Sequence, residues 1–135
     1  MKNYLTDYQV SSTASVEEFK SLEGALNFSF PTEYKEFLQT VGAGEGFVGN
    51  EYLIMWEASE LIEFNEDYEV EKYASNLFLF GSNGGGEAFY FDKSSLSKEI
   101  GIVPFIGMSS NHTKAISTSF REFLEKLHNP NEDIL

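Results

Sequence analysis

The chain contains no cysteine, so neither a disulfide framework nor a thiolate metal site can form. Basic residues are also scarce, because nine Lys and Arg stand against 22 Asp and Glu and give a formal net charge of −13. So acidic a protein is a poor ligand for a phosphate backbone or an anionic membrane, since both are bound mainly by Lys and Arg. We therefore expect neither nucleic acid nor a membrane among its direct partners.

Long apolar runs are absent as well. The opening residues MKNYLTDYQV lack the apolar core of a signal peptide, and no later run has the length of a membrane span. We therefore expect a cytoplasmic protein. With 41% hydrophobic and 16% aromatic residues, the 135 residues can form one domain over residues 1–135, and residues 1–14 are a candidate for a loosely held N-terminal arm.

Histidine occurs only at His112 and His128. With two isolated histidines, no cysteine and no EF-hand pattern, we expect no metal site and no cofactor. Neither histidine stands beside a nucleophile in a recognisable pattern, so no catalytic residues are predicted. A pair of carboxylates could serve as acid and base in a glycosidase, but 22 acids make some pair inevitable.

Three segments carry apolar residues at the spacing of amphipathic helices. The first follows Ser15 and Glu18, which match a capping box. The second begins at Pro31 and stops at Gly42, and the third carries apolar residues from Phe120 to Leu127. A fourth helix, broken or irregular toward its end, is predicted over residues 59–73.

Short segments rich in β-branched and aromatic residues predict the strands. A hairpin is expected around Gly49-Asn50, and further strands near residues 77–81, 87–92, 102–106 and 115–116. Pro104 would mark its strand as an edge or irregular strand, since proline has no N–H to donate. Helices that flank a mostly antiparallel central sheet give an α+β domain.

Two glycine-rich segments resemble phosphate-binding loops only superficially. Residues 44–49 match G-x-G-x-x-G, but a helix precedes them and a strand follows, the reverse of the dinucleotide-binding order. The run Gly84-Gly85-Gly86 lacks the Lys-Ser or Lys-Thr of a P-loop, so we interpret it as a tight turn.

The stretch from Glu36 to Glu71 holds ten carboxylates and no Lys or Arg, yet it is interspersed with aromatic residues. It is either a solvated surface that aids solubility or a docking surface for a basic partner. The candidate contacts are Glu45, Glu51, Glu57, Glu60, Glu63, Glu66, Asp67, Glu69 and Glu71. A second candidate is the turn of Asn83, Gly84, Gly85, Gly86 and Glu87. We interpret Trp56 as a core or core-edge ring, with an exposed binding anchor as the alternative.

Several motifs occur in the order typical of one superfamily. The segment FPTEYKEFL at 30–38 and the turn VGAG at 41–44 are followed by LFGSNGGGEAFYFD at 79–92, VPF at 103–105 and SFREFL at 119–124. Together they resemble the SUKH superfamily, which includes the fungal Smi-Knr cell-wall regulators. Departures are modest: Phe30 replaces a usual leucine, and Val41-Gly42-Ala43 replaces an Asn-Gly-Gly turn.

The resemblance implies an α+β fold without catalysis of its own. It also implies, for bacterial members, an immunity protein that binds and silences a polymorphic toxin, often a nuclease. Our hypothesis is therefore an immunity protein that neutralises a basic toxin nuclease through its acidic surface. A non-enzymatic regulatory scaffold, or a module that binds a peptide or small ligand, remains the alternative, and an enzyme ranks third.

Overall fold

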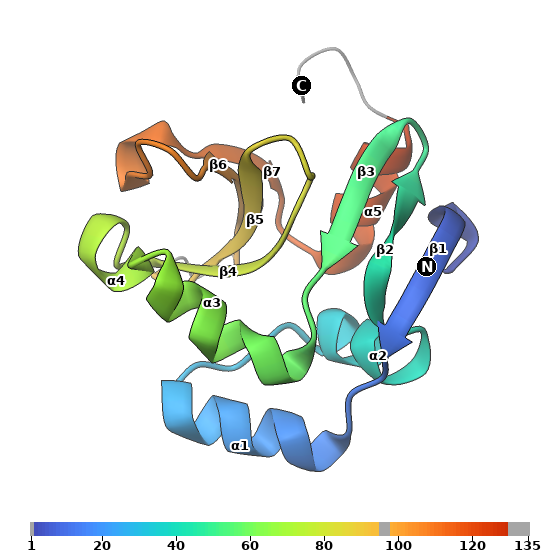
Figure 1. Cartoon of the computed structure of the whole chain (residues 1–135), viewed down its shortest axis with the longest axis horizontal. Helices are drawn as coiled ribbons and strands as arrows, with labels where there is room; N and C mark the ends of the chain where they lie inside the picture. Colours follow the sequence, from blue (N-terminus) through green and yellow to red (C-terminus); the bar gives the residue numbers. More distant parts are fainter. Residues whose placement is uncertain (1, 95–97, 130–135) are drawn as a thin grey trace.

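Seven antiparallel strands form one sheet in which each strand pairs with its neighbour in the sequence (Figure 1). The computed structural model describes residues 2–94 and 98–129. The strands are β1 (Leu5–Ser12), β2 (Ala43–Val48), β3 (Glu51–Met55), β4 (Leu77–Ser82), β5 (Glu87–Asp92), β6 (Ile100–Pro104) and β7 (Lys114–Ser117). The predicted hairpin around Gly49-Asn50 is confirmed as β2 and β3.

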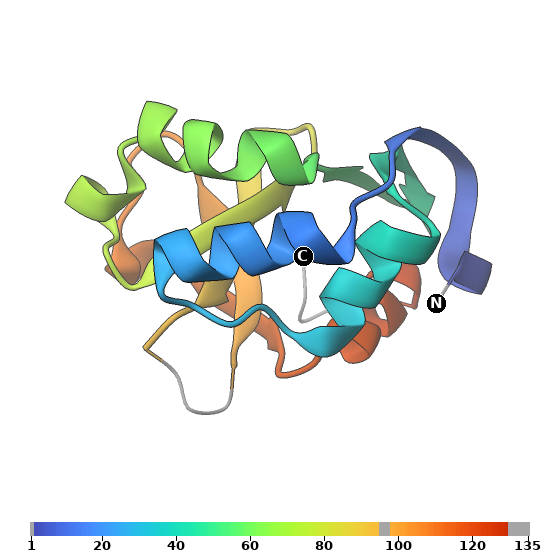
Figure 2. The same ribbon diagram turned by 90° about the horizontal axis from the view of Figure 1, so that it is seen from below.

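Five α-helices flank this sheet, so the predicted α+β class is confirmed. They are α1 (Val16–Leu26), α2 (Thr32–Thr40), α3 (Leu61–Asp67), α4 (Val70–Tyr73) and α5 (Phe120–His128). Three short 3-10 helices, η1 (Lys2–Tyr4), η2 (Ala58–Glu60) and η3 (Ser110–His112), complete the described part of the chain. Helix α5 lies behind β2 and β3 in Figure 1, and Figure 2 shows α1 running alongside α3.

The core is dominated by aromatic rings. Its fully buried rings include Phe19, Phe30, Tyr34, Phe37, Phe80, Phe89, Phe91, Phe120 and Phe123. The ring of Tyr34 on α2 lies 4.9 Å from that of Phe91 on β5 and 5.6 Å from that of Phe120 on α5, measured between centroids. Since a buried ring contributes roughly 1.5–3 kcal/mol, these contacts join the helices firmly to the sheet.

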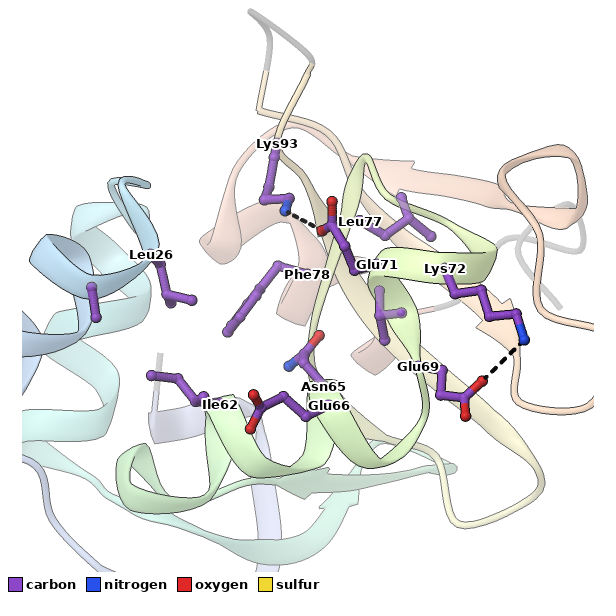
Figure 3. A pocket seen from close by; sticks show the side chains of 12 residues that line it. Leu26, Ile62, Asn65, Glu66, Glu69, Glu71, Lys72, Leu77, Phe78 and Lys93 are labelled. Carbon is purple, nitrogen blue, oxygen red and sulfur yellow. Dashed lines mark ion pairs between the residues drawn. The ribbon is translucent and has the colours of Figure 1, made fainter.

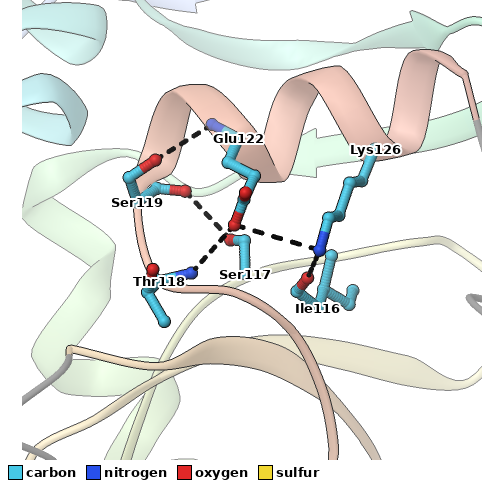
Figure 4. Close-up of polar contacts among 6 residues, drawn as sticks. All are labelled: Ile116, Ser117, Thr118, Ser119, Glu122 and Lys126. Atoms are coloured by element: carbon cyan, nitrogen blue, oxygen red, sulfur yellow. Dashed lines mark hydrogen bonds and ion pairs between the residues drawn. The ribbon is translucent and has the colours of Figure 1, made fainter.

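Side-chain caps fix where two of the helices begin. The predicted capping box is confirmed, because Ser15 accepts from the Glu18 N–H while the Glu18 carboxylate accepts from the Ser15 N–H. At α5, Ser119 accepts from the N–H of Glu122 (Figure 4). The last helix is thereby held against β7, where Lys126 donates to the Ile116 carbonyl.

The expectation of a loose arm at residues 1–14 was wrong. Residues 5–12 form the edge strand β1, which pairs antiparallel with β2. The glycine-rich residues 43–46 form most of β2. The reason is close backbone approach: a Cβ on Gly46 would lie 2.5 Å from the Cα of Tyr8, so only glycine permits this pairing.

Of the two alternatives predicted for the strand of Pro104, an edge strand is wrong, whereas an irregular strand is confirmed by a register shift between Ile100 and Gly101 on the β7 side. Strand β6 lies between β5 and β7. Pro104 is its last residue and pairs with Glu87 of β5, whereas the ladder to β7 reaches only Ile102. The missing N–H therefore falls beyond the part of β6 that is bonded on both sides. The predicted break in the helix over 59–73 is confirmed, since Glu69 adopts φ 53° between α3 and α4.

Candidate protein-interaction surface

The fold distributes the predicted acidic contacts over five elements. Two lie on strands, Glu45 on β2 and Glu51 on β3, and two lie at η2, which Glu57 precedes and Glu60 ends. The helix α3 carries Glu63, Glu66 and Asp67, and Glu69 and Glu71 lie at α4. The ion pairs among the described residues engage Glu23, Glu33, Glu69, Glu71 and Glu122. The other predicted acids therefore have no cationic partner within the described parts of the chain.

Three of the predicted carboxylates surround one recess. Glu45, Glu57 and Glu60 line a hollow of about 390 Å³ whose wall also includes Trp56, and we call it the acidic recess. Glu60 has a second task there, since its Oε1 accepts from the Glu57 N–H, 3.1 Å away, as part of a capping box at η2. Glu57 is the N-cap residue of the same capping box, and both of these glutamates are half-buried, so the exposed Glu45 is the carboxylate most available to a ligand in this recess.

Glu45 is held in place by a neighbouring tyrosine. The hydroxyl of Tyr52 on β3 donates to Oε2 of Glu45, at 2.5 Å. This hydrogen bond, together with partial burial and the nearby negative charge, raises the pKa of Tyr52 above its ordinary value. Tyr52 therefore stays a neutral donor, and the Glu45 side chain is exposed to solvent.

A second group of carboxylates shares one side of α3. Glu63, Glu66 and Asp67 are exposed, while Leu61 is buried on the opposite side. At 3.6 residues per turn, these three acids fall within an arc of about 100° around the helix axis. We call them the α3 acidic face, and they are the largest set of predicted contacts that one element presents together.

The acids at α4 lie in a different environment. Glu69 pairs with Lys72 at 3.8 Å, and Glu71 pairs with Lys93 at 3.7 Å (Figure 3). Both carboxylates border a pocket of about 580 Å³ between α1, α3 and β4, toward which Leu26, Ile62 and Phe78 point. Neutralised by local cations, Glu69 and Glu71 are weaker candidates than the α3 acidic face.

Glu51 is separated from the other predicted contacts. It pairs with Val48 at the hairpin end of β3, so it points to the opposite side of the sheet from Glu45. The turn of residues 83–87 is largely satisfied within itself, because Asn83 accepts from the N–H groups of Gly85 and Glu87 and donates to the Glu87 carboxylate. The side chain of Asn83 is therefore occupied within the turn, and the turn stays a candidate contact.

The interpretation of the sequence missed an apolar surface next to the acidic recess. Phe47 and Tyr52 pair across β2 and β3, as do Glu45 and Ile54, so these four side chains share the solvent side of the sheet. We call them the open face. The signal was present in the alternation, because Val48, Leu53 and Met55 are the buried set and their neighbours must point the other way.

Trp56 and the two histidines make contacts within the fold. Trp56 is only 7% exposed and its ring lies 5.0 Å from that of Phe64, which confirms the core-edge interpretation. His112 Nδ1 is 2.8 Å from the Gly107 carbonyl oxygen, and the ring of His128 packs on Tyr4. Within residues 2–94 and 98–129, no three His, Asp or Glu side chains are grouped to hold a metal ion.

Helices long and apolar enough to cross a membrane do not occur among the described residues. Comparison with known proteins gives one family: the profile of the SMI1 / KNR4 family (SUKH-1) matches residues 13–126. The match covers more than half of the chain and includes α1, α2, most of the sheet and most of α5. No curated protein matches the chain.

Proposed function

Because the chain belongs to the SMI1 / KNR4 family (SUKH-1), we propose that it is a non-catalytic immunity protein. In this proposal it binds and neutralises a cognate toxin, a basic nuclease domain, through its acidic surface. The observation that carries the proposal is the group of unpaired carboxylates on the α3 acidic face and around the acidic recess. These acids lie on neighbouring elements, with no Lys or Arg between Glu36 and Glu71.

The chemistry of a nuclease supports this partner. A nuclease must present cations to the phosphates of its substrate, and a carboxylate-rich surface is complementary to that field. Such complementarity accelerates encounter and selects the partner, while the buried contacts of the complex set how long it lasts. A net charge of −13 on 135 residues supplies the long-range attraction.

The test is the association rate with the toxin domain encoded beside this chain. We expect binding to abolish toxin activity, and the association rate to fall at least about tenfold from low to physiological ionic strength, because salt screens the attraction. Stopped-flow mixing at several salt concentrations gives this rate. A rate independent of salt would contradict electrostatic steering.

A matched pair of triple variants locates the attraction. Glu63→Gln, Glu66→Gln and Asp67→Asn together remove the α3 acidic face, while Glu17→Gln, Glu36→Gln and Asp7→Asn remove the same charge from exposed side chains elsewhere. We expect the first variant to slow association several-fold more than the second, with both melting near the wild-type temperature, because exposed unpaired acids contribute little to stability. Equal slowing would show that only net charge matters.

A ligand-binding module is the second candidate, and the pocket of Figure 3 favours it. Its volume of about 580 Å³ lies within the range of small-molecule sites, and its wall combines apolar side chains with Lys72 and Lys93. Thermal-shift screening of peptides and metabolites checks this function. A ligand that raises the melting temperature of the wild type but not of Lys93→Ala would support it.

A further inference from the structure

The open face is unusually apolar for the solvent side of an antiparallel sheet, where polar residues normally alternate with the buried ones. Of its four side chains only Glu45 is charged. Phe47 is 42% exposed, and its ring packs edge-on against that of Tyr52 with centroids 5.1 Å apart. Exposed aromatic surface of this kind marks interaction sites, because Tyr, Trp and Phe are enriched there.

The glycine turn of residues 83–87 borders the open face, and further exposed apolar side chains lie on the other side of this turn. A Cβ on Gly84 would lie 3.4 Å from the ring of Tyr52, so the turn of residues 83–87 lies directly against the open face. The N–H of Phe105 donates to the Gly86 carbonyl, and the ring of Phe105 lies 4.5 Å from that of the 43%-exposed Tyr68. The next residue, Ile106, is 94% exposed.

The charges nearest the open face are all of one sign. Glu45 lies within the open face, and Glu57 and Glu60 lie across the acidic recess from it. Strands β1, β2 and β3, with η2 and α3, contain no Lys or Arg. A ligand that covers the rings therefore meets uncompensated carboxylates at their border.

The edges of the sheet favour binding on its face. The edge strand β1 pairs irregularly, with register shifts on both sides of Gln9 and Val10, and Asp7 has φ 53°. The other edge, β7, has only four residues. Bulged and short edges resist the addition of another strand, so a partner has little backbone to pair with there.

We infer that the open face is the docking site for an arginine-bearing surface of the partner protein, an inference that rests on the proposed function. The open face combines aromatic rings with a carboxylate. Arginine is the side chain that binds both, because its guanidinium stacks on aromatic rings and forms paired hydrogen bonds with a carboxylate. Phe47 and Tyr52 provide the rings and Glu45 the carboxylate.

The experiment uses the full-length protein and a short peptide that alternates arginine with glycine, with its lysine counterpart as a control. We expect amide NMR shifts to concentrate on residues 45–54 and the arginine peptide to bind more tightly. Phe47→Ala and Glu45→Gln should each weaken its binding about fivefold. The matched variants Tyr73→Ala and Glu36→Gln, which change an exposed ring and an exposed acid elsewhere, should leave binding unchanged.

Three outcomes would overturn the inference: shifts centred on α3 or on the pocket of Figure 3, equal binding of the two peptides, or insensitivity to both open-face variants. If the chain forms a concentration-dependent dimer that Phe47→Ala dissociates, the open face binds a second copy of the chain, and the inference is also overturned. Toxin neutralisation is scored separately. If the Glu45→Gln, Phe47→Ala double variant still neutralises the toxin fully, the open face is not the docking site, but the immunity function is unaffected. If the wild type binds the arginine peptide at the open face but does not neutralise the toxin, the immunity function is wrong, but the arginine site is unaffected.

Discussion

Tyr34 carries a hydroxyl that is fully buried at the centre of the aromatic core. Among the described residues this hydroxyl has no hydrogen-bond partner, although rings of Phe19, Phe30, Phe91 and Phe120 surround it. A buried polar group without a partner costs stability, because it loses its hydrogen bonds to water on folding. The Tyr34 hydroxyl therefore lowers the stability of the fold, and phenylalanine at this position would not.

We expect Tyr34→Phe to raise the free energy of unfolding by about 1 kcal/mol, because it removes the unpaired hydroxyl and keeps the ring. Urea denaturation of the two proteins measures the difference. The matched control is Tyr90→Phe, which removes a hydroxyl that donates to Glu99 at 2.8 Å and should destabilise. A destabilised Tyr34→Phe would mean that the hydroxyl has a partner, such as bound water.

Burial also makes three tyrosines sensitive to alkali. It raises the pKa of Tyr8, Tyr34 and Tyr90 well above the ordinary value of 10, and the bond to Glu99 adds to the effect at Tyr90. The unfolded chain then loses these protons first, so unfolding becomes easier as pH rises past 10. We expect a constant free energy of unfolding up to about pH 9 and a steep fall above it, less steep in Tyr34→Phe. Urea titrations at each pH measure it.

At the scale of elements, one side chain attaches α3 to the sheet. Asn65 Nδ2 donates to the carbonyls of Leu61 and Leu79, and its Oδ1 accepts from the Leu79 N–H, at 2.8–2.9 Å. This arrangement fixes the rotation of α3, so that Glu63, Glu66 and Asp67 face solvent. The acidic face thus depends on a residue that carries no charge.

We expect Asn65→Ala to lower the free energy of unfolding by about 2 kcal/mol, since it leaves the buried Leu79 N–H and carbonyl without their partner. Chemical denaturation measures this loss, and hydrogen exchange should show faster exchange at Leu79 and along α3. Glu66→Ala, one residue further along the same helix and exposed, is the matched control and should stay within about 0.5 kcal/mol of wild type. Similar losses in both would assign the effect to helix propensity.

For the whole molecule, a charge of −13 means that the folded chain repels itself. We expect the melting temperature at neutral pH to rise by roughly 3–5 °C from low to physiological salt, because screening relieves about 1 kcal/mol of repulsion. Calorimetry measures this rise. Near the isoelectric point of about 4.4 the net charge vanishes, so the same addition of salt should have almost no effect.

Local patterns predicted most of the elements because their causes are local. Ser15 and Glu18 fix the start of α1 through bonds three residues apart, and the apolar stripe from Phe120 to Leu127 faces the core for reasons of helix periodicity. Strand β1 escaped prediction because its partner, β2, lies more than 30 residues away, and because the glycines of β2 indicated a turn as readily as a close approach of two strands. Because these glycines did not identify β2 as a full strand, the open face that β2 forms with β3 was also missed.

The sequence by itself determined the α+β class, the family, the broken acidic helix and the absence of Lys and Arg between Glu36 and Glu71. These properties follow from composition, spacing and hydrogen bonds between near neighbours. Only the tertiary structure decided which carboxylates share a surface. Glu45 joins Glu57 and Glu60 because β2 passes the start of η2, whereas Glu71 meets Lys93, which comes from beyond β5. Contacts between distant segments depend on how the whole chain packs, and no local pattern contains them.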